Sequence, residues 1–268
     1  MVRSSCRYRA KTRGEDEQSL RDRIKELAHR HKRFGCPRIT ALLNREGLKA
    51  NKKRVHRIWK GEGLQVKRKR RGPSGEVVNK AEYMNHVWSY DFVEDRTESG
   101  SKIRFLNIVD EFTRECLGIE AGKSMGAKEV IECLEWLFLT RGAPEHIRSD
   151  NGPEFVARAV REWLKKENCK TLYIEPGSPW ENPYIESFNG KFRDECLNME
   201  LFRNVPEAQD IADAWREEYN EYRPHSSLGN LTPKEFAEIL SADTAPPSAS
   251  PNLQKVEEKN NPLIPSGT

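Results

Sequence analysis

Three acidic residues lie in sequence contexts where a carboxylate needs a partner. Asp91 interrupts the apolar, aromatic run HVWSYDFV, Asp150 ends the run HIRSD, and Glu186 lies in a segment with helical periodicity. A carboxylate within a central strand costs free energy unless it is paired or bound to a cation. We therefore expect Asp91 to have such a partner, and we expect the fold to bring Asp150 and Glu186 to the same end of a sheet.

The spacing of these residues is weaker evidence than their context. Fifty-eight residues separate Asp91 from Asp150, and 35 separate Asp150 from Glu186. Because the chain has 10 aspartates and 32 glutamates, an Asp–Glu pair is expected by chance at any fixed separation. The prediction therefore rests on where each residue lies, and less on the distances between them.

The segment around Glu186 predicts a helix over residues 182–198. Asn182 can cap this helix, and Pro183 suits its first position. Apolar residues at helical spacing form its buried stripe: Ile185, Phe188, Phe192 and Cys196. Polar residues at offsets of three and seven form another face: Glu186, Asn189 and Arg193. Two interpretations stay open, since this face either contacts a ligand or is the solvated side of an ordinary amphipathic helix.

The region that contains the three acids predicts an α/β domain with a mixed sheet. Three strands come first in a meander, and helices and strands then alternate, as in sheets that mix antiparallel and parallel pairs. The predicted strands are residues 86–93, 105–109, 116–121, 146–150 and 171–175, and the predicted helices are 126–141, 153–168 and 207–222.

The front of the chain is strongly basic and predicts a nucleic-acid partner. Residues 1–72 hold 24 lysines and arginines against 7 acidic residues, although the whole chain has a formal net charge of only +4. Apolar residues predict three short helices, the third capped by Asn51. Basic residues line the outer side of this third helix: Lys52, Lys53, Arg54, Arg57 and Lys60. A helix-turn-helix module that binds DNA explains this charge, and a small structural bundle with a solvated face is the alternative.

Composition excludes some other classes. The longest apolar runs are too short for a membrane span, and the basic start lacks the apolar core of a secretory signal. Six single cysteines without a CxxC pair predict a reducing, cytoplasmic setting. We interpret His29, His31 and Cys36 as helix and loop residues, because no second cysteine pair accompanies them as zinc ligands.

At the level of motifs, the chain resembles a known superfamily. The segments WSYDFV, IRSDNGPEF and YIESFNGKFRDECLN resemble the catalytic core of DDE transposases and retroviral integrases. The nearest resemblance is to the second-frame product of bacterial insertion sequences whose transposase is made from two overlapping reading frames. It covers about residues 20–240, and Pro37 and Pro183 depart from the usual pattern.

The resemblance implies a fold, a metal site and a DNA-binding surface. The fold is an RNase H-like five-stranded mixed sheet with flanking helices, preceded by a small all-α domain. Asp91, Asp150 and Glu186 would hold two Mg²⁺ ions, for which Mn²⁺ can substitute. Beyond the third basic helix, we predict DNA contacts for Asn189, Lys191 and Arg193. The alternative for Arg193 is a surface ion pair with Asp194 or Glu195.

These expectations define a domain plan. Residues 1–19 form a basic flexible arm, 20–66 a helix-turn-helix domain and 67–80 a basic linker. Residues 81–240 form the integrase-like catalytic core with a helical C-terminal segment, and 241–268 form a disordered tail.

The function implied by the resemblance is that of an insertion-sequence transposase. It would bind double-stranded DNA at element ends, cut it, and join the 3′-hydroxyl to target DNA. The expected partners are further copies of the chain on DNA and the first-frame protein or a fusion with it, in the bacterial cytoplasm at the nucleoid and without membrane attachment. A non-catalytic regulator of transposition and an RNase H-fold nuclease that cuts without joining are the alternatives.

Overall fold

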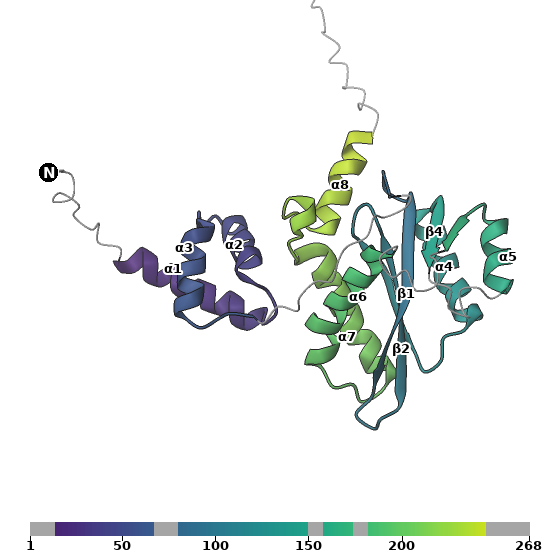
Figure 1. Ribbon diagram of the computed structural model, residues 1–268, viewed down its shortest axis with the longest axis horizontal. Coiled ribbons are helices and arrows are strands. Elements are labelled where there is room, and N and C mark those ends of the chain that lie inside the picture. Colours follow the sequence, from purple (N-terminus) through teal and green to yellow (C-terminus); the bar gives the residue numbers. More distant parts are fainter. Residues whose placement is uncertain (1–13, 67–79, 150–157, 174–181, 245–268) are drawn as a thin grey trace, which may run out of the picture.

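The computed structural model describes residues 14–66, 80–149, 158–173 and 182–244. Within these ranges the chain forms a three-helix module followed by an α/β domain (Figure 1). Most of the predicted arm, most of the predicted linker, Asp150 and most of the predicted tail lie outside the described residues. No helix in the described ranges has both the length and the apolar character needed to cross a membrane.

The front module is built as its sequence predicts, around one apolar core. Its helices are α1 (Gly14–Arg30), α2 (Cys36–Arg45) and α3 (Lys52–Gly61). Asn51 caps α3, because its side chain accepts a hydrogen bond from the Lys53 N–H. Pro37 lies in the first turn of α2, where a missing N–H costs nothing, so the second helix forms despite it. Trp59 and Ile39 are buried in the core of the module.

Helix α1 begins at Gly14, within the segment predicted to be a flexible arm. Asp16 and Glu17 lie near this start, where the positive end of a helix dipole favours acidic side chains. Periodicity of apolar residues could not reveal this start, since the first buried apolar side chain is Leu20.

The α/β domain contains the predicted five-stranded mixed sheet, with strand order β3-β2-β1-β4-β5. Strand β1 is antiparallel to β2 and parallel to β4, while β4 is parallel to β5. The RNase H-like prediction is therefore confirmed at the level of topology. The strands are β1 (Val87–Arg96), β2 (Lys102–Asp110), β3 (Cys116–Gly122), β4 (His146–Ser149) and β5 (Lys170–Tyr173).

Helices cover both faces of the sheet (Figure 1). On one face, Trp88 and Leu106 pack with helices α4 (Ala127–Arg141) and α5 (Arg158–Lys166). On the other face, Phe105 packs with helices α6 (Pro183–Glu195) and α7 (Val205–Glu217). Successive residues of a strand point to opposite faces, so the two cores share the same strands.

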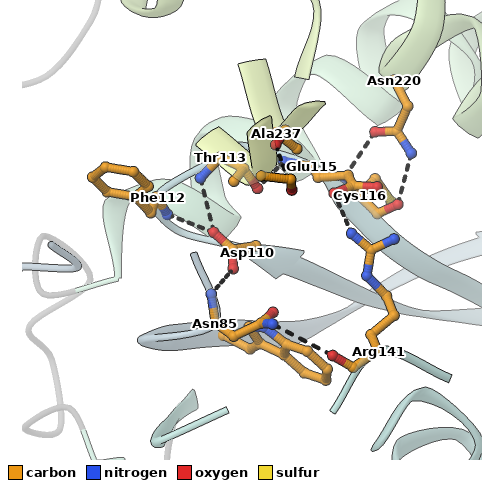
Figure 2. Close-up of polar contacts among 11 residues, drawn as sticks. Asn85, Asp110, Phe112, Thr113, Glu115, Cys116, Arg141, Asn220 and Ala237 are labelled. Carbon is orange, nitrogen blue, oxygen red and sulfur yellow. Dashed lines mark hydrogen bonds and ion pairs between the residues drawn. The ribbon is translucent and has the colours of Figure 1, made fainter. Parts of the chain in front are cut away.

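The C-terminal segment folds back on the end of the sheet. A short 3₁₀ turn follows α6 at Leu197–Met199, and a π-helical turn, Glu218–Tyr222, follows α7. A second 3₁₀ turn, Ser226–Leu228, then leads to helix α8 (Pro233–Thr244). In the π-helical turn the Asn220 side chain accepts from the Cys116 N–H at 2.9 Å and donates to its carbonyl at 2.8 Å (Figure 2). Asn220 thereby extends the hydrogen bonding of β3.

Asp110 fixes the turn that ends β2. Its carboxylate accepts hydrogen bonds from the N–H groups of Phe112 and Thr113 at 2.8 Å and from that of Asn85 at 2.7 Å (Figure 2). Asn85 has a φ of 63°, in the left-handed region that asparagine tolerates. One buried carboxylate therefore holds both the β2–β3 turn and the turn that leads into β1.

A buried ion pair joins β4 to the end of β2. The Arg148 Nε lies 2.7 Å from Glu111 Oε1, and the Ser89 hydroxyl of β1 donates to the same oxygen. Both charged side chains are almost fully buried, at 4% and 0% exposed for Arg148 and Glu111. Removal of one partner would leave the other charge uncompensated in the core.

We expect Arg148→Met to lower the free energy of unfolding by about 3–5 kcal/mol, because it leaves the Glu111 carboxylate buried and unpaired. Urea unfolding followed by circular dichroism measures this change. The matched control is Arg158→Met, which removes an arginine from the exposed Arg158–Glu162 pair and should cost at most about 1 kcal/mol. Equal effects of the two substitutions would contradict a structural role for the buried pair.

Candidate active site

Asp91 lies in the middle of β1, opposite Asn107 of β2, on the face that α6 covers. Its Oδ2 accepts a hydrogen bond from the Asn189 amide of α6 at 2.8 Å, and its Oδ1 accepts from the Phe92 N–H at 2.8 Å. The Asn189 carbonyl oxygen accepts in turn from the Asn107 amide at 2.8 Å. Since Asn107 is fully buried, this chain of amides sets the orientation of the Asp91 carboxylate from the core outward.

Glu186 lies one turn before Asn189 on the same helix. Residues three apart on a helix have Cβ atoms about 5–6 Å from each other, so Glu186 lies one helical turn from the residue that contacts Asp91. Partial burial raises the pKa of the Glu186 carboxyl above its ordinary value. Within the described ranges, no ion pair or hydrogen bond offsets that desolvation. A bound cation would supply the positive charge that stabilises the Glu186 carboxylate.

The helix that carries Glu186 forms as predicted, with one correction. Ile185, Phe188 and Phe192 are buried, and Pro183 takes the first helical position. Asn182 occupies the N-cap position but makes no capping hydrogen bond, and its Oδ1 is buried without a partner in the described structure. Its ψ of 48° departs from the extended conformation that capping residues usually have, which explains why the predicted cap does not form.

The third predicted acid, Asp150, lies outside the described residues. Its neighbour Ser149 ends β4, and β4 pairs in parallel with β1 through Ser89 and Arg148. The assignment of Asp150 to the site remains a prediction.

The described donors fit a hard divalent cation. Asp91 and Glu186 offer carboxylate oxygens, the ligand type that Mg²⁺ selects. The buried Asn107 Oδ1, on the strand next to Asp91, has no hydrogen-bond partner in the described parts of the chain, so it can still accept a hydrogen bond. Two neutral amides, the Asn189 side chain and the Phe92 N–H, donate to the Asp91 oxygens.

Arg193 does not form the surface ion pair that was its alternative. Its guanidinium donates to the Glu94 carbonyl of β1 at 2.8 Å. Asp194 and Glu195 instead pair with arginines of the front module: Arg33 with Asp194, and Arg38 with Glu195 at 3.1 Å. Arg193 thus contacts β1, the strand that carries Asp91, at a position three residues beyond Asp91.

Lys191 lies in a partly buried cluster of charges. Burial, together with the positive charges of Arg223 and Arg38, lowers the pKa of Lys191 to about 7, although Glu195 acts in the opposite direction. Glu195 accepts two hydrogen bonds from Arg223, each of 2.7 Å. Burial raises the pKa of Glu195, but the hydrogen bonds and charge of Arg223 outweigh it and keep that pKa below the ordinary value. Lys191 is therefore an amine that can lose its proton near neutral pH.

The basic side of α3 is exposed as predicted, apart from the half-buried Arg54. Arg57 pairs with Glu17 of α1 at 3.0 Å, and Arg54 lies 4.0 Å from the same carboxylate. Lys52, Lys53 and Lys60 have no ion pair within the described residues. Phosphate groups could therefore contact the lysines directly and compete with Glu17 for the arginines.

The contact between the front module and the core was not predicted from the sequence. Besides the pairs of Arg33 and Arg38, Arg45 of α2 binds Glu235 of α8 at 2.6 Å. His31 lies 2.9 Å from Glu218 and stacks on Tyr222 with ring centroids 5.1 Å apart. The only sequence signal was the pairing of a basic front with an acidic remainder, which does not say which residues meet.

Comparison with known proteins agrees with this architecture. Residues 81–179 and 167–233 each match an integrase core domain, and residues 15–72 match an HTH-like domain. In an intasome of simian T-cell lymphotropic virus in complex with a PP2A regulatory subunit, one chain is similar in fold, with a TM-score of 0.51 and 17% identity. That alignment covers 91% of this chain and 80% of the viral chain.

Two relatives encoded by insertion elements are similar along most of their length. An uncharacterized 31.7 kDa protein of insertion element IS407 from Burkholderia multivorans is 41% identical over 258 residues, which cover 94% of this chain and 92% of that protein. The transposase of IS904 from Lactococcus lactis is 29% identical, over 82% of this chain and 94% of that protein. This chain therefore belongs to the family of insertion-sequence transposases with an integrase core domain, which are DDE-type polynucleotidyl transferases.

Proposed function

We propose that this transposase binds the ends of its element, cuts a strand there and joins the freed 3′-hydroxyl to target DNA. The observation that carries the proposal is the contact of Asn189 with Asp91, which brings helix α6 and its Glu186 to the strand that bears Asp91. In the proposed site, the carboxylates of Asp91 and Glu186, from distant parts of the chain, would face the same region.

The integrase core family is metal-dependent, and here Asp91, Asp150 and Glu186 would hold two Mg²⁺ ions or Mn²⁺ in their place. When bound, two such ions activate an attacking oxygen and neutralise a leaving oxygen of the phosphodiester. Asn189 keeps the Asp91 carboxylate aimed at the site through its 2.8 Å hydrogen bond. Arg193, at the neighbouring edge of β1, would bind a DNA phosphate beside the reacting one with its forked guanidinium.

Helix α3 would supply the affinity for DNA. Its exposed lysines and arginines can neutralise phosphates, and the N-terminal turn of the helix can reach base edges in the major groove. Further copies of the chain and a first-frame protein would complete the assembly on the bacterial nucleoid. A regulator that only binds DNA and a nuclease that only cuts it are the competing functions, and measurements of joining separate all three.

The three acids are the first test. Asp91→Asn, Asp150→Asn and Glu186→Gln should each abolish cleavage and joining of labelled element ends in Mg²⁺ or Mn²⁺, because each removes a charge that holds the ions. DNA binding and the far-ultraviolet circular dichroism spectrum should stay near those of the parent protein.

Each assay is run with and without the first-frame protein. Joining at the parent rate by any one variant removes that residue from the site. Cleavage without joining by the parent protein would favour the nuclease, and binding without either reaction would favour the regulator.

The basic helix is the second test. Replacement of Lys53, Arg54 and Arg57 together by Ala should make the salt dependence of DNA binding less steep, by up to about 2.7 in the slope of log K against log salt. The control replaces Lys128, Arg161 and Lys165, which are exposed on α4 and α5, and should leave the slope unchanged. The same slope for the parent and the α3 variant would mean that these residues face solvent in the complex.

Lys191 provides a third test, through pH. If Lys191 contacts phosphate, DNA binding by the parent protein should weaken between pH 6.5 and 8.5, because an amine with a pKa of about 7 loses its charge in that window. Lys191→Arg keeps the charge throughout and should bind equally at both pH values. Lys191→Met should bind weakly at both. A parent-like pH dependence in Lys191→Met would show that another group titrates and that Lys191 does not contact DNA.

A further inference from the structure

A second group of potential metal ligands lies at the other end of the catalytic strands. His86 directly precedes β1, and Glu145 and His146 lie at the start of β4. One ligand atom from each of the three side chains can be chosen so that all lie within 4.8 Å of one another. The parallel pairing of Val87 with His146 accounts for their proximity, because it aligns the beginnings of the two strands.

The backbone holds these three residues in place before any ion binds. The His146 N–H donates to the His86 carbonyl at 2.9 Å, and the Glu145 N–H donates to the Asn85 carbonyl at 3.0 Å. Asn85 is itself fixed by Asp110, as Figure 2 shows. The two segments therefore keep their separation, and only side-chain rotation is needed to close the three ligands around an ion.

The side chains are also oriented. His86 Nδ1 accepts a hydrogen bond from the Glu82 N–H at 3.1 Å, so the neutral ring carries its proton on Nε2. A metal ion would bind the Nδ1 lone pair in exchange for this hydrogen bond. Tyr83 stacks on His86 with ring centroids 4.4 Å apart, and its hydroxyl donates to Glu145 Oε2. His146 Nδ1 is buried and has no hydrogen-bond partner within the described structure. The hydrogen bond of Tyr83 to Glu145 is an outer contact of the kind that orients carboxylate ligands in known metal sites.

This group is separate from the three acids. His86 precedes Asp91 by five positions on an extended strand, which corresponds to about 16 Å. His146 likewise begins β4, and Ser149 ends it. Its donor set differs too, because two imidazoles and one carboxylate suit a borderline transition metal better than Mg²⁺.

We propose that His86, Glu145 and His146 form a binding site for a divalent transition-metal ion, and that zinc is the ion it takes. Three protein ligands leave a fourth position of a tetrahedral zinc ion for water. The ion would join the turn of residues 82–86, where the chain enters the core, to β4. It would thus stabilise the end of the sheet opposite to the catalytic acids.

The test uses the full chain with Asp91→Asn, Asp150→Asn and Glu186→Gln, so that the acids do not bind the added ion. After treatment with EDTA and dialysis, Co²⁺ is titrated while visible absorption is recorded, and Zn²⁺ is then added as competitor. One equivalent of Co²⁺ should give d–d bands without the thiolate charge-transfer bands of cysteine ligation, and Zn²⁺ should displace it. Zn²⁺ should also raise the melting temperature.

Single substitutions in the same background identify the ligands. His86→Gln, His146→Gln and Glu145→Gln should each weaken Zn²⁺ binding at least tenfold, and Tyr83→Phe should weaken it about tenfold through loss of its hydrogen bond to Glu145. His56→Gln, which changes an exposed histidine of α3, should have no effect. Circular dichroism confirms that each variant is folded, and Glu145→Gln at an exposed position serves if a histidine variant is not. Parent-like affinity in the folded ligand variants, or thiolate bands with Co²⁺, would overturn the proposal.

Discussion

The packing of α6 against the sheet is the constraint on which the active site depends. Phe192 meets Phe105 of β2 with ring centroids 5.3 Å apart, and Phe188 meets Tyr219 at 5.0 Å. Burial of each such ring contributes about 1.5–3 kcal/mol, so the helix cannot turn about its axis without a large loss. A shift of one residue would rotate its polar face by about 100° and carry Glu186 away from Asp91.

Much of this arrangement could be predicted from the sequence, because it follows from local patterns. The apolar stripe of α6 gave its buried face correctly, and the strand and helix signals gave a mixed sheet whose topology is confirmed. The cap by Asn51 follows from residue type and position in the same way. The misassigned details, such as the early start of α1 and the missing cap at Asn182, depend on a few hydrogen bonds or charges at helix ends.

What the sequence did not reveal depends on contacts between distant segments. His86 and His146 are 60 positions apart and meet only because β1 and β4 pair in parallel in one register. The DNA contact of Asn189 stays a prediction, whereas the hydrogen bonds of its amide to Asp91 and Asn107 are long-range contacts that the sequence did not indicate. No periodicity records which side chain of one element will reach which side chain of another.

The last turn of α6 also determines where the front module lies. Asp194 holds Arg33 and Glu195 holds Arg38, one to three turns along the helix from Asn189 and Glu186. In the proposed function, the front module that would bind DNA and the Glu186 carboxylate are thus attached to the same helix of 13 residues. Such an arrangement would fix the distance between the DNA-binding helix and the site of cleavage. On a DNA end bound by both parts, the protein would set the number of base pairs between the sequence that α3 recognises and the bond that is cut. A spacer one base pair longer would also rotate the cut bond about 34° around the duplex axis.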